Sequence, residues 1–391
     1  MAWLQRYFHR PQQLRVRRLN FQVHLWVGII LTLYMVVIGV TGSILVFRSE
    51  LERLYALKPW QNIRANAPFA DLATVVENLR AAYPRYRIVS VDAPSDNNAT
   101  FVAVLQGRRQ ITVACGPKDG KVLGEFPGVA SWLDVIDELH VSLLVPSRGR
   151  GRMLNGIGAA FLLLLNATGI VIWWPGIRNW KRALMVDFKR NWRRINFDLH
   201  VVVGFWTILI ASFWAVSGIY FGWPRQIFQF VNSISPVITA RPPAITVAPE
   251  ASTSEPELRS LIARAHAADP GTTLEGIAFP YGRRAPLGIL MRRGPSVGRE
   301  YVDTVYFNPY NGEYISTWRY GVNKSLGDWI IWMQVPLHFG TYWGLTVKIV
   351  WALAGLAIPL LAITGLLMYW NRWLRRKWKA LHKAKPAALA A

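Results

Sequence analysis

The sequence is poor in cysteine, and this shortage limits the kinds of redox or metal centre that it can build. Among its 391 residues Cys115 is the one cysteine, so the chain can form no internal disulfide and no cluster of thiolates. No Gly-x-Gly-x-x-Gly fingerprint occurs either, which excludes binding of a dinucleotide or flavin by that motif. Any redox centre must therefore be held by other side chains.

Acidic residues are also scarce, numbering 22 against 45 Lys and Arg, which gives a formal net charge of +23. The excess gathers in three segments, 1–22, 175–199 and 371–391, where only Asp187 and Asp198 offset it. These segments alternate with apolar runs and fall on one side of a membrane topology. This distribution predicts cytoplasmic segments in contact with anionic lipid, and it argues against binding of nucleic acid.

Long apolar runs are what the sequence has in abundance, since 52% of its residues are hydrophobic. Four runs are long enough to cross a bilayer, and Trp and Tyr gather at their ends. The first is too long for a signal-peptide core and lacks an Ala-x-Ala site, so we expect an uncleaved anchor. The predicted spans, the first with its cytoplasmic lead-in, are 1–47, 153–174, 200–223 and 344–370.

The segments 48–152 and 224–343 then lie on the outer side of the membrane. The loop 175–199 and the tail 371–391 lie on the cytoplasmic side, and the spans connect the two sides. Each outer segment shows a helical apolar pattern, followed by β-branched runs bounded by turn residues. The strands are expected at 87–92, 100–105, 110–114 and 121–126, and again at 274–279, 287–291, 301–307 and 313–318. The fold class predicted is a membrane protein of four transmembrane α-helices in two tandem halves, each with a small α+β domain outside.

Four of the seven histidines occupy equivalent positions in this repeat. His24 and His200 open the first and third apolar runs, and each is followed eighteen residues later by a glycine of a Thr-Gly or Ser-Gly pair. His140 and His338 precede the second and fourth runs, which close with Thr168-Gly169 and Thr364-Gly365. A tandem repeat pairs equivalent residues across one axis, so each membrane face receives two imidazoles.

Two imidazoles at each face are the ligand set of bis-histidine haem, because haem iron accepts two axial ligands and imidazole suits iron. The motif for covalent attachment, Cys-x-x-Cys-His, is missing, so the prediction is two non-covalent haems of b type. A lone histidine at a helix end is more often an interfacial polar residue. The fourfold repetition favours iron ligation by His24, His200, His140 and His338.

Other site residues are assigned by depth in the membrane alone, and no residue is singled out as catalytic. Nearby glycines are expected to leave room for the macrocycle. Arginines at the two faces are candidates to bind haem propionates: Arg17, Arg18, Arg193 and Arg194 inside, and Arg148, Arg150 and Arg152 outside. Candidates for an outer substrate site are Trp132, Trp329, Trp332 and Arg148.

The chain resembles the PepSY-associated transmembrane proteins. The residues that carry the resemblance are His24-Leu-Trp-Val-Gly, Thr41-Gly-Ser-Ile-Leu-Val-Phe, the turns Asp119-Gly-Lys-Val-Leu and Tyr310-Asn-Gly-Glu-Tyr, and the Thr-Gly closings. It covers nearly the whole chain, and the arrangement is more specific than any one motif. Within the family the chain looks most like ferric-siderophore reductases of the bacterial inner membrane. That resemblance implies PepSY-like periplasmic domains and two b haems carrying electrons across the membrane.

The function expected is thus a di-haem b oxidoreductase that takes electrons from a quinol or a protein donor and reduces a ferric siderophore in the periplasm. Reduction releases iron because hard oxygen ligands favour ferric over ferrous iron. Two alternatives stay open: a non-redox permease or accessory protein for iron-siderophore uptake, and a regulatory PepSY binding protein.

Overall fold

The computed structural model describes residues 15–51, 69–94, 99–126, 131–237, 243–245, 256–293, 302–319, 325–341, 344–375 and 378. They divide into two compact units. The membrane unit gathers the described parts of Met1–Arg48, Trp132–Ser233 and Ile331–Ala391, and the sheet unit those of Ser49–Ser131 and Ile234–Ile330.

Four long helices confirm the four predicted spans. They are α2 (Arg15–Leu45), α6 (Arg148–Trp173), α7 (Trp192–Gly222) and α11 (Gly344–Tyr369), the last continued by a π-helical turn, Trp370–Leu374. Each of them is long and apolar enough to cross a membrane. Helix α7 begins eight residues before the predicted span 200–223, because a polar, basic turn extends the helix beyond its apolar part.

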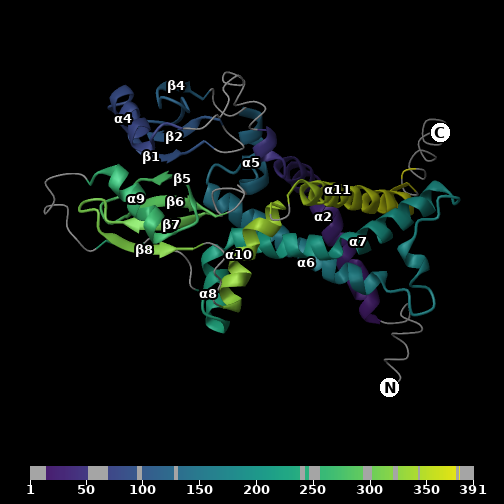
Figure 1. The fold of residues 1–391 in the computed structure, drawn as a ribbon. Helices are drawn as coiled ribbons and strands as arrows, with labels where there is room; N and C mark the ends of the chain where they lie inside the picture. The colour runs from purple at the N-terminus through teal and green to yellow at the C-terminus, as the bar shows by residue number, and fades with distance from the viewer. Residues whose placement is uncertain are drawn as a thin grey trace, which may run out of the picture. The chain divides into compact units, whose positions relative to one another are not determined.

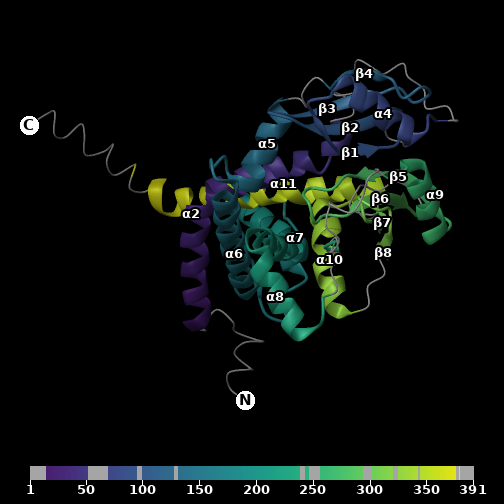
Figure 2. The same cartoon turned by 90° about the vertical axis from the view of Figure 1, so that its left-hand side faces the viewer.

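The membrane unit is a four-helix bundle in which α2 and α7 each pack against both α6 and α11 (Figures 1 and 2). Small residues let the backbones approach closely. A Cβ on Gly39 of α2 would come within 2.8 Å of the carbonyl oxygen of Gly355 on α11. A Cβ on Gly222 of α7 would come within 2.9 Å of the Cα of Gly156 on α6.

Shorter helices flank the spans. Helix α5 (Ser131–Ser142) leads into α6, α8 (Pro224–Ile234) follows α7, and α10 (Leu326–Phe339) leads toward α11. A 3-10 turn, Arg182–Leu184, lies in the basic loop between α6 and α7. Two of the four histidines singled out above therefore lie on α5 and α10, outside the spanning helices.

The sheet unit contains helices α4 (Leu72–Ala82) and α9 (Leu258–Ala268) and one antiparallel sheet of eight strands, in the order β4-β3-β2-β1-β5-β6-β7-β8. Apolar residues of both helices and of the inner strands share one core (Figure 1). The strands are β1 (Arg87–Asp92), β2 (Phe101–Gln106), β3 (Gln110–Cys115), β4 (Val122–Glu125), β5 (Thr273–Ala278), β6 (Leu287–Arg292), β7 (Asp303–Phe307) and β8 (Tyr314–Trp318).

This single sheet differs from the two separate outer domains predicted at 48–152 and 224–343. Strands β1 and β5 pair antiparallel, with Ser90 opposite Ala278 and Asp92 opposite Gly276. Two separate domains would each have left one of these strands as an open edge with unpaired backbone groups. The boundaries differ too, since 132–152, 224–233 and the described part of 331–343 belong to the membrane unit.

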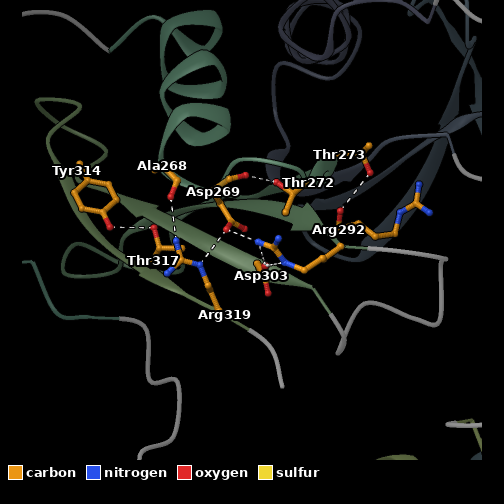
Figure 3. A network of polar contacts seen from close by, with 10 residues as sticks. Ala268, Asp269, Thr272, Thr273, Arg292, Asp303, Tyr314, Thr317 and Arg319 are labelled. Atoms are coloured by element: carbon orange, nitrogen blue, oxygen red, sulfur yellow. Dashed lines mark hydrogen bonds and ion pairs between the residues drawn. The ribbon is translucent and has the colours of Figure 1, made fainter. Parts of the chain in front are cut away.

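A buried carboxylate ties the end of α9 to the neighbouring strands (Figure 3). Asp269 caps the helix and is fully buried. One of its oxygens, Oδ1, accepts hydrogen bonds from Arg293 at 2.6 Å and from Arg319 at 3.0 Å. Two guanidinium groups thus compensate the buried charge, which gives this cluster a structural role in the sheet unit.

Candidate functional site

The structure brings the four histidines together as two pairs. His24 of α2 and His200 of α7 have ring centroids 6.2 Å apart, with ring planes at 90°. His140 of α5 and His338 of α10 have centroids 6.4 Å apart, with planes at 63°. Both pairs lie in the membrane unit, and each joins residues far apart in the sequence, as the repeat predicted.

The first pair is anchored by the two helices that do not carry it. His24 Nδ1 lies 3.1 Å from the carbonyl oxygen of Leu165 and 3.1 Å from the hydroxyl of Thr168, both on α6. His200 Nδ1 lies 3.1 Å from the carbonyl oxygen of Leu361 and 3.0 Å from the hydroxyl of Thr364, both on α11. A carbonyl oxygen can only accept, so each Nδ1 carries the proton.

The second pair uses hydroxyls in the same way. His140 Nδ1 lies 2.9 Å from the hydroxyl of Thr41 on α2, and His338 Nδ1 lies 2.6 Å from the hydroxyl of Ser217 on α7. The backbone of these histidines is held as well. The side-chain amide of Asn155 donates to the carbonyl of His140 at 2.7 Å, and the indole N–H of Trp214 donates to that of His338 at 3.2 Å.

The four hydroxyl groups that contact the imidazoles can only accept a hydrogen bond from them. Each donates its own proton to the carbonyl four residues earlier in its helix, at distances from 2.6 to 2.9 Å. The imidazole Nδ1–H must then be the donor to the hydroxyl, which leaves the lone pair of Nε2 free. A hydrogen bond that fixes one nitrogen and frees the other is the usual support of a metal-ligating histidine.

The spacing within each pair suits one metal ion between two imidazoles. A metal–imidazole bond is about 2 Å long and a ring nitrogen lies about 1 Å from its centroid, so two rings on opposite sides of a metal have centroids roughly 6 Å apart. The structure shows no cluster of three or more His, Cys, Asp or Glu residues able to hold a bare ion in the part of the chain that it describes. Two protein ligands are too few for a bare ion, whereas haem supplies the other four nitrogens itself.

Burial keeps the imidazoles of the second pair in the neutral form. It lowers the pKa of His140 to about 4 and the pKa of His338 to about 3, and the latter is lowered further by the neighbouring His140. Asp137 opposes the effect of burial on the pKa of His140. At neutral pH both rings are therefore uncharged, and a lone pair is available on each.

Comparison with known protein families gives a match over most of the chain. The model of the PepSY-associated transmembrane region matches residues 21–372, a range that contains both pairs. The chain belongs to this family. A comparison with curated proteins finds no match.

Three of the glycines in this PepSY-associated protein lie directly against the paired imidazoles, and their expected role in leaving room for a macrocycle stays a prediction. A Cβ on Gly42 would lie 2.9 Å from Cε1 of His140. A Cβ on Gly169 or Gly365 would lie 3.4 Å from Cε1 of His24 or 3.3 Å from Cε1 of His200, respectively. The glycine after each of these threonines thus allows the imidazole to lie against the helix backbone.

The predicted propionate arginines separate into two groups. Three have protein partners: Arg17 donates to the carbonyls of Ile172 (2.5 Å) and Trp174 (2.6 Å), Arg194 pairs with Asp198 (2.9 Å), and Arg148 pairs with Asp137 (3.2 Å). The other four are exposed: Arg18, Arg193, Arg150 and Arg152.

One buried donor near the first pair is left without a partner. The indole Nε1 of Trp173, five residues after Thr168, is buried and has no hydrogen-bond acceptor among the described residues. Its ring stacks on Phe205 of α7 at 4.3 Å. Five residues correspond to about 7.5 Å along a helix, which is within the reach of a propionate from a haem centred on His24 and His200. This orphaned N–H is consistent with a cofactor at that position.

The predicted substrate residues are distributed over both units of the structure. Trp132 on α5 and Trp332 on α10 belong to the membrane unit, whereas Trp329 belongs to the sheet unit. Trp132 and Trp329 are 38% and 49% exposed, respectively. Their role in an outer substrate site stays a prediction, which rests only on the side of the membrane where they are expected.

Sequence reasoning missed the residues that hold the histidines. Thr41, Thr168, Ser217 and Thr364 were visible as small residues beside glycine, yet their role as hydrogen-bond partners was not predicted. The sequence did contain a usable pattern, because four hydroxyl–glycine pairs recur in the same repeat as the four histidines. Asn155 and Trp214 have no such repeated pattern.

Proposed function

We propose that this protein is a di-haem b oxidoreductase of the bacterial inner membrane that takes electrons from a quinol or a protein donor and reduces a ferric siderophore, or a similar iron chelate, in the periplasm. The observation that carries the proposal is the pair of imidazoles near each end of the bundle, each ring with Nδ1 as donor and Nε2 free. Haem bound there would supply one-electron redox chemistry.

The two pairs are well placed for transfer across a membrane. On α2, His24 belongs to the first pair and Gly42 lies against His140 of the second. The eighteen residues between them correspond to about 27 Å of helix, close to the thickness of the hydrocarbon core. This separation supports one proposed ligand pair near each membrane face.

Charge supports the direction of transfer. The basic starts of α2 and α7 lie at the same end as the first pair, and the positive-inside rule favours a cytoplasmic position for that end. The second pair and the sheet unit are then periplasmic. Reduction there would release iron, because the hard oxygen ligands of a siderophore bind ferric iron more tightly than ferrous iron.

The test is reduction of a ferric hydroxamate by purified protein in lipid nanodiscs, with a water-soluble quinol as donor and a chromogenic ferrous chelator as reporter. We expect ferrous iron to appear with the wild type and to be lost in His140→Ala. His266→Ala, on α9, is the matched control and keeps the activity. A haem-containing protein that reduces neither this chelate nor a catecholate or citrate chelate would contradict the assignment of substrate.

A further inference from the structure

Helix α8 begins where a spanning helix ends. α7 ends at Gly222, its cap is Trp223, and α8 starts at Pro224. The carbonyl of Trp223 already accepts a hydrogen bond from the amide of Ile227. The apolar part of α7, from His200 to Gly222, covers 23 residues or about 34 Å, which is the full hydrocarbon thickness. α8 therefore starts at the membrane face opposite the basic segments.

The residues of α8 separate cleanly into two faces. At 100° per residue, one side of the helix carries only polar side chains: Arg225, Gln226, Gln229, Asn232 and Ser233. The other side carries only apolar ones: Ile227, Phe228, Phe230, Val231 and Ile234. Such segregation is typical of helices that lie along a boundary between water and an apolar phase.

The protein covers only part of the apolar face. Val231 is buried, whereas Phe230 is 64% and Ile234 is 71% exposed. Phe230 and Ile234 are four residues apart and so lie on one stripe, turned away from the polar side chains. α8 thus has three sides. One packs on the protein, one is polar, and one is an apolar stripe that the described residues leave exposed.

We propose that α8 lies in the plane of the membrane surface and inserts Phe230 and Ile234 among the lipid acyl chains. The occupant is lipid because α8 is continuous with a span and starts at the membrane face. Figure 1 shows α8 turning away from the end of α7. The anchor does not depend on the proposed redox function.

The test uses site-directed spin labels on the full chain in lipid nanodiscs. Cys115 is replaced by alanine, so that Phe230→Cys, Ile234→Cys and Gln229→Cys each provide one labelling site. Power saturation then compares collisions with oxygen, which partitions into lipid, and with a water-soluble nickel chelate. We expect labels at 230 and 234 to lose nickel accessibility and gain oxygen accessibility relative to the label at 229.

Two results would overturn the proposal. Nickel accessibility at 230 and 234 equal to that at 229 would place both side chains in water. Protection from both reagents would mean that protein covers the stripe, either a second copy of this chain or another partner. Circular dichroism of each labelled variant shows whether it retains the helical content of the wild type, and the second labelled position guards against a local defect at the first.

Discussion

The two histidine pairs share one chemistry but differ in how the chain supports them. The first pair lies on two spanning helices, and each Nδ1 has both a backbone carbonyl and a hydroxyl within 3.1 Å. The second pair lies on the short helices α5 and α10, which side chains of the bundle hold in place. Within the second pair, His140 also has a backbone hydrogen bond with Ile38, whereas His338 bonds the side-chain hydroxyl of Ser217, so the contrast with the first pair is sharpest at His338.

This difference predicts unequal sensitivity to mutation. A hydroxyl lost from the first pair leaves a carbonyl acceptor for Nδ1, because that carbonyl belongs to the backbone. The second pair depends more on individual side chains, and Asn155 and Trp214 fix its backbone. The following changes act on one pair at a time and are ordered by expected effect.

Removing an imidazole should have the largest effect. We expect His200→Ala and His338→Ala each to lose about half of the bound haem, since each deletes one of two axial ligands at one site. The reduced-minus-oxidised difference spectrum measures the loss, and the double variant should lose nearly all of it. Full haem content in either single variant would show that the deleted residue is not a ligand.

Gly42→Ala should disturb the second pair alone. The new Cβ would lie 2.9 Å from Cε1 of His140, and overpacking of this kind costs about 1–3 kcal/mol. Gly28→Ala on the same helix is the control, because its Cβ meets only Leu165 at 3.8 Å. The redox midpoints of the two haems, resolved by titration, should shift for one haem with Gly42→Ala and for neither with Gly28→Ala.

Ser217→Ala should weaken its site more than Thr168→Val. His338 loses the 2.6 Å hydrogen bond to Ser217, whereas His24 keeps the Leu165 carbonyl at 3.1 Å. Loss of such support typically lowers metal affinity about 10- to 100-fold. The rate of haem transfer to apomyoglobin reports the difference, and equal rates for the two variants would contradict the unequal support.

Trp214→Phe should give the smallest effect. It removes the 3.2 Å hydrogen bond to the carbonyl of His338, worth about 0.5–1.5 kcal/mol, and keeps an aromatic ring. Trp206→Phe, at an exposed position on the same helix, is the control. Thermal loss of the Soret signal should occur at a lower temperature in the first variant only. An equal shift in both variants would contradict a stabilising role for the hydrogen bond from Trp214.

The sequence was sufficient for the spans and for the pairing of histidines, because hydrophobic length and repeat spacing determine both. It did not predict the shared sheet, since β1 and β5 pair through backbone groups that carry no side-chain signal. The contact between Gly42 and His140 was not predicted, because only the packed structure shows which ring lies against this glycine. The long side chain of Arg17 reaches the end of α6, a contact that depth alone cannot specify.

The central claim is that four histidines ligate two haems, and the pyridine haemochrome assay on purified wild-type protein tests it most directly. Protein isolated from haem-supplied cells should contain about two b haems per chain, with low-spin bis-imidazole signals in electron paramagnetic resonance. A colourless preparation from the same cells, folded by circular dichroism and lacking a Soret band, would contradict the account.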